Sequence, residues 1–315
     1  MKTLVKYLIY MFIIVILSFV LPRLIPGSPL FAMSEDINAV GIMTNEAFKA
    51  FQEYYAPELP FLEQFWKYFK SIINLDFGYS FYYKMPVNKL IKERIGWTFL
   101  LSFLSILISS IIGIFFGIRS GLKDRESKFM IGVLLSVQAI PTFLIAAIFQ
   151  IVIAYKLRLL PPTGAYSPGM YIGQHGYVKD VLRHILLPLL VLTISGVPSI
   201  YIFAKNSTAN VKKEQFVKMA RYLNIKNRDI YYKYIFKNII PELLGRLNIQ
   251  FVLAITGSIF VEVVFSYPGL GQLLRNAISY RDYPLLQGIL LVSCIYGLIV
   301  NLIFELVILN NIKRY

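Results

Sequence analysis

The chain has few of the residues that make disulfides, metal sites and catalytic pairs. Its 315 residues include one cysteine, Cys294, and two histidines, His175 and His184. One cysteine cannot form a disulfide within the chain, and no cysteine or histidine pair has the spacing of a zinc site. The sequence also has no G-x-x-x-x-G-K-[ST] phosphate loop. We therefore expect no internal disulfide, no metal site and no ATP hydrolysis through such a loop.

Charged residues are scarce too, at 16% of the chain, whereas hydrophobic residues make up 57% and the mean hydropathy is +0.62. Soluble domains are about 45–50% apolar. In a soluble protein a net charge of +15 would suggest a nucleic-acid partner. Here the charges lie between apolar runs, and no patch interleaves basic with aromatic residues. We expect an all-α polytopic protein of the lipid bilayer with no nucleic-acid partner.

Apolar runs long enough to cross a bilayer, which needs about 20 apolar residues per helix, occur six times. They cover approximately Tyr7–Ile25, Trp97–Ile118, Phe129–Tyr155, Ile185–Phe203, Gly245–Phe265 and Leu285–Leu309. The first follows Lys2 and Lys6 as in a signal peptide, but no small-residue cleavage site follows Leu21, so we expect an uncleaved span. The fourth contains Pro188 and Pro198, and such breaks persist only where protein or water satisfies the freed backbone groups.

The loops predict the orientation of these spans. The segment Lys205–Pro241 carries nine basic residues, whereas in Ser28–Gly96 seven bases are balanced by eight acids. Because Lys and Arg are enriched in cytoplasmic loops, both termini are expected in the cytoplasm and 28–96 outside. The chain then divides into a tail and first span (1–27), an external loop subdomain (28–96), a five-helix core (97–309) with an inner loop at 205–241, and a cytoplasmic tail (310–315). Within the external loop, Glu58–Ile73 has the spacing of an amphipathic helix.

Polar residues within the predicted spans are functional-site hypotheses, because such groups are costly at membrane depth. As a translocation path we single out Gln138, Asn248, Gln250, Ser258 and Glu262. The amides can equally serve as hydrogen bonds between helices, and Glu262, near a span end, can equally reach the interface. Small residues recur on one face of the second span, which favours close helix packing over a ligand site. These are Gly113, Gly117 and Gly121.

The inner loop Lys205–Pro241 predicts two short helices, Lys213–Leu223 and Asn227–Asn238. They are separated at Asn224, a residue type that tolerates the left-handed backbone of a turn. The first helix is expected to carry Phe216, Met219, Ala220 and Leu223 on one face. From the residues alone, a docking element for a partner and a solvated basic loop or lipid-headgroup contact remain equally open.

A resemblance favours docking. Glu214–Arg221 followed by Asn224 resembles the cytoplasmic coupling loop of binding-protein-dependent ABC permeases, which docks in a cleft on an ATP-binding subunit. Asn224 stands where the family usually has Gly, and Gln215 where an acid is common. The resemblance assigns the ATPase contact to Glu214, Phe216, Val217, Ala220, Arg221 and Asn224.

Further stretches are similar, in order along the chain, to the oligopeptide/dipeptide/nickel B-type subunit of that family. They are Leu75–Ser80, Pro86–Val87, Arg94–Thr98, Leu160–Gly164, Phe265–Gly271, Arg281–Gly288 and Asn311–Tyr315. Tyr267 replaces a usual Trp, and Asn311 a typical Asp. The resemblance places an external gate, on the side of the binding protein, at Pro268, Gly269, Gly271, Arg281, Asp282 and Tyr283.

The resemblance implies a type I ABC importer permease fold with six transmembrane helices, not an enzyme, and without a cofactor of its own. It implies a second homologous permease, two ATP-binding subunits that hold ATP and magnesium, and an extracellular solute-binding protein. The expected cargo is di- or oligopeptides; nickel or a chelated metal is the alternative. A proton-coupled secondary transporter would need carboxylates or histidines in mid-span, and an intramembrane hydrolase would need a nucleophile with a partner there.

Overall fold

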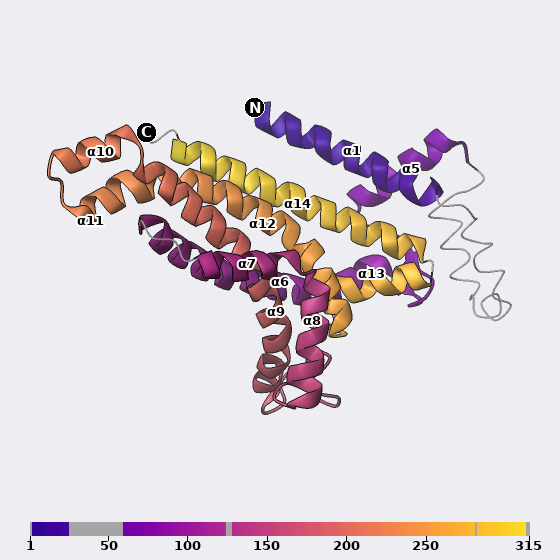
Figure 1. Cartoon of the computed structure of the whole chain (residues 1–315). Helices are drawn as coiled ribbons and strands as arrows, with labels where there is room; N and C mark the ends of the chain where they lie inside the picture. The colour runs from indigo at the N-terminus through magenta and orange to yellow at the C-terminus, as the bar shows by residue number, and fades with distance from the viewer. Residues whose placement is uncertain (1, 25–58, 124–127, 281, 313–315) are drawn as a thin grey trace. The chain divides into compact units, whose positions relative to one another are not determined.

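The computed structural model describes residues 2–24, 59–123, 128–280 and 282–312, and these residues are almost entirely helical (Figure 1). The first half contains α1 (Lys2–Leu24), α5 (Phe61–Ile73), the antiparallel strands β1 (Tyr79–Ser80) and β2 (Met85–Pro86), α6 (Val87–Leu122), α7 (Lys128–Ala139), α8 (Thr142–Phe149) and the π-helix η1 (Gln150–Lys156). The second half contains α9 (Tyr177–Lys212), α10 (Gln215–Tyr222), α11 (Asn227–Asp229), the π-helix η2 (Ile230–Phe236), α12 (Lys237–Val264), α13 (Leu270–Ser279) and α14 (Tyr283–Ile312).

The structure confirms the predicted class, an all-α protein with several helices that are long enough to cross a membrane. Among the described residues, four helices are long and apolar enough to span a bilayer: Val87–Leu122, Tyr177–Lys212, Asn227–Val264 and Tyr283–Asn310. The bent pair of α7 and α8–η1 makes a fifth crossing if it counts as one span. In α1 the apolar stretch Val5–Val20 is shorter. The count of six therefore depends on the bent pair and on α1, and it stays a prediction.

The third predicted span, Phe129–Tyr155, is not one straight helix. Its two halves meet at 95°, at the step from Ile140 to Pro141, and Figure 1 shows α7 and α8 turning sharply away from each other. Proline has no backbone N–H and disfavours the helical conformation in the residue before it, so a helix ends readily at this step. By contrast, α9 continues as one helix through Pro188 and Pro198, both of which are buried.

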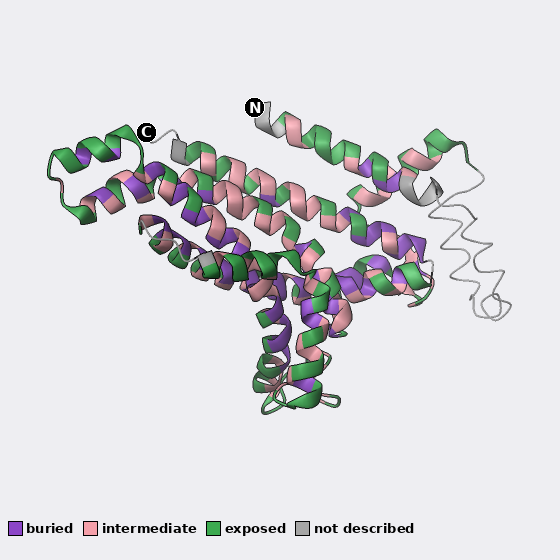
Figure 2. Ribbon diagram, viewed as in Figure 1, coloured by how far each residue is buried: buried purple, intermediate pink, exposed green. Residues whose placement is uncertain are grey.

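The chain forms two compact units. Unit 1 comprises Met1–Thr98 and Pro268–Ile299, and unit 2 comprises Phe99–Tyr267 and Val300–Tyr315. The core of unit 1 joins α1, α5, the start of α6, α13 and α14 through buried side chains (Figure 2). A Cβ atom added at Gly288 would lie 2.7 Å from Val87 Cγ1, so a residue without a side chain lets α14 approach α6 there.

In unit 2 a stripe of glycines holds α6 against α9. A Cβ added at Gly113 would lie 2.8 Å from Ile200 Cβ. At Gly117 and Gly121 it would lie 2.6 Å from a backbone carbonyl oxygen of α9. Because backbone atoms cannot move aside as a side chain can, only glycine permits this approach. The predicted packing role of the three glycines is confirmed.

Candidate functional site

The loop of unit 2 between α9 and α12, predicted to be cytoplasmic, forms a short helix followed by a tight turn. Helix α10 begins after Glu214 and is followed by Asn224, whose φ of 54° is left-handed. The Ile225 N–H donates to the Ala220 carbonyl at 3.1 Å, which closes the turn. The predicted break at Asn224 is confirmed. The second predicted helix does not end at Asn238, because α11, η2 and α12 together form the long helix Asn227–Val264.

Helix α10 has a buried face and an exposed face (Figure 2). Val217 and Ala220 are 0% and 2% exposed, and they belong to a core with Ile230 and Ile235 of η2. This corrects the expectation that Ala220 shares a face with Phe216, Met219 and Leu223. The exposed face of α10 carries apolar residues, and sequence reasoning missed one of them, Tyr222. They are Phe216 (40%), Met219 (61%), Tyr222 (84%) and Leu223 (63%).

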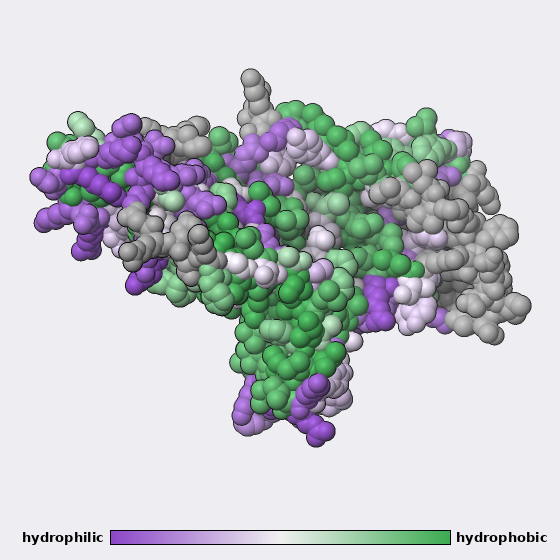
Figure 3. Space-filling view, in the orientation of Figure 1, coloured by the Kyte–Doolittle hydropathy of each residue, from purple (hydrophilic) through white to green (hydrophobic). Residues whose placement is uncertain are grey.

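Polar residues surround this exposed apolar face, and the α10–α11 region is largely hydrophilic in Figure 3. Glu214, Arg221 and Asn224 are exposed, as expected of a surface loop. Further basic side chains of the loop are exposed at Lys213, Lys218, Lys226 and Arg228. The loop therefore combines an apolar centre with a charged rim, the usual anatomy of a protein–protein contact.

A second feature of unit 2 is a pocket of about 170 Å³ among α6, α8, α9 and α12. The hydroxyls of Ser105, Ser109 and Ser195 each donate to a carbonyl one turn earlier in their own helix, at 2.8–3.1 Å. Oxygen lone pairs therefore remain available to a ligand or water in the pocket. Thr142 and Gln250 add further polar groups. Polar linings of this kind at membrane depth are costly and mark solute paths or water-filled cavities.

The structure separates the five predicted path residues. Gln250 lines the pocket, whereas Gln138 is exposed on α7. The Asn248 amide donates to Asn301 Oδ1 at 2.8 Å, which makes it the helix-to-helix hydrogen bond that was the alternative interpretation. Ser258 is buried and donates to its own helix. Glu262 is 0% exposed and so does not reach the surface of the chain.

The serines of the pocket were missed by sequence reasoning. Ser105 and Ser109 lie four residues apart on α6, so they share one face of the helix. Two serines at this spacing in an otherwise apolar run were the signal from which a polar face of the helix could have been predicted. Room beside them comes from α9, because a Cβ at Gly196 would lie 3.1 Å from Ser109 Oγ and 3.4 Å from Gln250 Nε2.

In unit 1, one of the predicted external gate residues, Asp282, anchors the start of a helix. Asp282 is 1% exposed and accepts hydrogen bonds from Ser80 Oγ at 2.5 Å, from the Tyr82 N–H at 3.2 Å and from the Leu285 N–H at 3.3 Å. It thereby caps the start of α14 and ties it to the β1–β2 turn. Burial raises the pKa of the Asp282 carboxyl, against the opposing effect of these hydrogen bonds.

The other described gate residues are buried or half-buried as well. Gly269, Gly271 and Tyr283 are buried and Pro268 is half-buried. Arg281 lies outside the described residues. Two stretches that carried the resemblance, at 75–80 and 281–288, thus meet through Ser80 and Asp282. Their contact with a binding protein stays a prediction.

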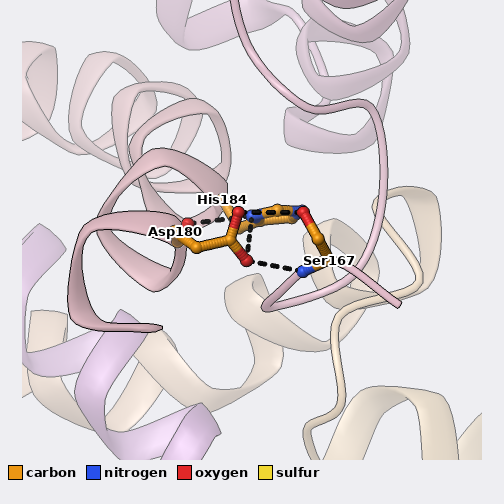
Figure 4. A network of polar contacts seen from close by, with 3 residues as sticks. All are labelled: Ser167, Asp180 and His184. Carbon is orange, nitrogen blue, oxygen red and sulfur yellow. Dashed lines mark hydrogen bonds and ion pairs between the residues drawn. The ribbon is translucent and has the colours of Figure 1, made fainter. Parts of the chain in front are cut away.

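A serine, an aspartate and a histidine meet in unit 2, beside the start of α9 (Figure 4). Asp180 accepts hydrogen bonds from the Ser167 N–H at 2.6 Å and from Ser167 Oγ at 2.8 Å, while His184 Nδ1 lies 2.9 Å from the Asp180 carbonyl oxygen. In a nucleophilic triad the serine hydroxyl would donate to the histidine. Here it donates to the carboxylate, so the cluster fastens a loop to the helix. His184 lies within α9, next to the start of the predicted span Ile185–Phe203.

The fold and these features define a helical multi-pass membrane protein with an exposed apolar helix face on one loop and a polar pocket among its spans. Residues 109–315 match the family described as binding-protein-dependent transport system inner membrane component, and the chain belongs to that family. It is thus a permease component of an ABC importer, as the resemblance predicted.

Several relatives are similar over nearly the whole chain. A protein of Brucella ovis named as a peptide permease is 30% identical over 92% of this chain and 90% of its own. The oligopeptide transport system permease protein OppB of Salmonella typhimurium is 28% identical over 89% and 86%. The glutathione transport system permease protein GsiC of Salmonella paratyphi A is 26% identical over 100% and 98%.

A solved structure supports the fold. A chain of the MetNI methionine ABC transporter, in an inward-facing conformation, matches with a TM-score of 0.54 and 14% identity over 70% of this chain and 96% of its own. At this identity the likeness concerns the fold alone. It confirms the type I importer permease fold expected from the sequence.

Proposed function

We propose that this chain is the permease subunit of an ATP-driven importer that carries di- or oligopeptides across the cytoplasmic membrane. The names of three relatives support this cargo: a peptide permease, an oligopeptide permease and a permease for glutathione, itself a tripeptide. ATP hydrolysis belongs to separate subunits of such importers, and a binding-protein-dependent permease implies a substrate-binding partner.

The complex we propose contains a second homologous permease beside this chain. Two ATP-binding subunits hold ATP and magnesium, and an extracellular solute-binding protein delivers the cargo. Both termini and α10 face the cytoplasm. The observation that carries the assignment is the exposed apolar face of α10, because an apolar surface on a charged inner loop is suited to docking another protein.

The buried face of α10 explains how docking moves the spans. Val217 and Ala220 pack against η2, which continues into α12, and the same core includes Ala204 and Val211 of α9. A force on α10 therefore reaches two spans through close-packed side chains, which transmit strain because interiors resist compression. Alternating access then follows as a two-state motion driven by ATP-dependent closure below.

We propose that the polar pocket is the part of the solute path that unit 2 provides. It offers hydroxyl oxygens and the Gln250 amide, and no charged side chain is among its lining residues within the described part of the chain. Such a lining suits the neutral amide groups of a peptide backbone or the waters that accompany it. Of the residues predicted from the sequence for this path, Gln250 is the one retained.

The docking role is tested by placing a charge on the exposed face. Met219→Glu introduces a carboxylate at a position that is 61% exposed, so the fold of the permease should be unaffected. We expect at least a tenfold loss of affinity for the ATP-binding subunits, about 1.4 kcal/mol, because the charge would be desolvated in the contact. Co-purification from membranes and peptide uptake into vesicles measure this loss.

Lys218→Gln is the matched control, since Lys218 is a neighbouring exposed residue outside the apolar face. It should retain the ATP-binding subunits and most of the uptake. Normal retention and uptake in Met219→Glu would contradict docking through α10.

The cargo is tested separately, by ATP-dependent uptake into vesicles that contain the whole importer. We expect labelled di- and tripeptides to accumulate and to compete with one another. Accumulation of nickel chelates instead would overturn the peptide assignment while leaving the permease role intact. Uptake that survives ATP depletion and stops when the proton gradient collapses would overturn both.

A further inference from the structure

Helix α5 of unit 1 has an apolar surface wider than its partner helix covers. Phe65, Phe69 and Ile72 pack into the core against α1, and the Tyr68 hydroxyl lies 2.8 Å from Ser18 Oγ. A second apolar strip remains exposed, formed by Leu62 (69%), Trp66 (59%) and Ile73 (65%). These three residues are spaced i, i+4 and i+11, so they lie along one side of the helix. The polar residues Glu63, Lys67 and Lys70 occupy another side.

The position of α5 along α1 indicates its depth. Phe61 contacts Phe19 at a ring distance of 5.2 Å, and Phe69 contacts Phe12 at 6.3 Å. Later residues of α5 thus meet earlier residues of α1, so the chain runs back along α1. Both contacts lie within the apolar stretch Val5–Val20. Helix α5 therefore lies beside the predicted first span and not beyond its end, although it belongs to the loop predicted to be external.

The exposed strip is continuous with the apolar outer surface of α1. Trp66 and Phe69 are in edge contact at 5.7 Å, and Phe69 touches Phe12, which is itself 46% exposed. Along α1 the exposed surface continues through Leu8, Ile9, Ile13 and Leu17. On a span, such a surface faces acyl chains.

We propose that α5 is embedded in the outer leaflet beside α1. Leu62, Trp66 and Ile73 contact lipid acyl chains, and the side of α5 that carries Lys67 and Lys70 is turned away from this strip. The occupant of this strip is the bilayer, because its apolar surface continues that of the adjoining span. In this position α5 fixes the depth of the first span in the bilayer, and this role does not depend on which cargo is carried.

The chain is well suited to a direct test, because Trp66 and Trp97 are its only tryptophans. In Trp97→Phe, Trp66 alone reports its surroundings. The full chain is placed in phosphatidylethanolamine–phosphatidylglycerol nanodiscs, with or without lipids brominated at the 6,7 position of one acyl chain. We expect brominated lipid to reduce Trp66 emission by at least half, and aqueous acrylamide to quench it several-fold less than free tryptophan.

A second readout uses the whole importer in cells. In a Cys294→Ser background, Trp66→Cys should react with a membrane-impermeant maleimide at least tenfold more slowly than the matched control Lys67→Cys. Efficient acrylamide quenching of Trp66 without lipid quenching would show a water-facing strip and overturn the proposal. Protection from both quenchers would show that protein covers the strip, a second copy or a partner, and would overturn it as well.

Discussion

The loop around α10, predicted to be cytoplasmic (the inner loop), and the segment around Asp282, predicted to be external (the outer segment), both carry the family resemblance, yet the exposure of their side chains is opposite. On α10, Met219 and Tyr222 are 61% and 84% exposed. In the outer segment, Asp282 and Ser80 are 1% and 0% exposed and bind each other. A motif can therefore lie on an exposed surface or be buried as a requirement of folding. The exposed fraction of the side chains distinguishes the two cases, and the sequence of the motif does not give that fraction.

The largest expected effect comes from placing a carboxylate on the buried face of α10, compared with the same change on its exposed face. Ala220→Glu buries a carboxyl among apolar side chains with no partner for its charge, which should cost about 3–5 kcal/mol of stability. Met219→Glu should leave stability unchanged. Thermal unfolding of the purified permease and its level in the membrane measure the difference. Equal stability of the two variants would contradict the burial of Ala220, because a carboxylate is tolerated without cost only at the surface.

In the outer segment, Asp282→Ala should destabilise unit 1 by about 2–4 kcal/mol. The change leaves the buried Ser80 hydroxyl and the N–H groups of Tyr82 and Leu285 without their acceptor, and it removes the cap of α14. The unfolding midpoint and the amount of protein in the membrane should both fall. Ser279→Ala, at an exposed position at the end of α13, is the control. Unchanged stability with lost affinity for the solute-binding protein would make Asp282 a contact residue after all.

Much of the fold could be predicted from the sequence because hydrophobic length and the conformational preferences of residue types act locally. The apolar runs, the glycine stripe and the turn at Asn224 each follow from residue types at fixed spacing. The 95° break at Pro141 could not be chosen over the intact helix at Pro188 and Pro198. Tertiary surroundings decide whether a proline bends a helix or is accommodated.

The site was harder to predict, since burial depends on residues far apart in the chain. Val217 and Phe216 are neighbours, yet one is buried against η2 and the other is exposed. The pocket combines serines from α6 and α9 with Gln250 of α12. Asn248, just two residues earlier, is instead bonded to Asn301. Partners separated by dozens of residues leave no periodic signal in the sequence.

A smaller effect is expected at the exit of α10. Asn224 has a φ of 54°, which costs a residue with a Cβ about 1 kcal/mol and a β-branched residue more. Asn224→Gly should therefore raise stability by up to about 1 kcal/mol, and Asn224→Val should lower it by about 1–2 kcal/mol. Thermal unfolding of the two variants provides the measurement. If Val were tolerated as well as Gly, the turn would not depend on the left-handed conformation.

The smallest effect is a pH dependence in the outer segment. Burial raises the pKa of Asp282 above its unfolded value, so the protonated form is the one that the fold favours. The stability that this group contributes is fully present below the unfolded pKa of about 3.9 and is lost as the pH rises through the folded pKa. Asp282→Asn keeps the shape and one oxygen acceptor but cannot titrate.

We therefore expect the unfolding temperature of the unchanged chain, relative to that of Asp282→Asn, to increase as the pH is lowered from 8 towards 4. Subtracting the variant removes the contributions of the other carboxyl groups, which the two proteins share. A relative stability that fell on acidification would mean that the hydrogen bonds to Asp282 outweigh its burial. The carboxylate would then be the form that the fold stabilises.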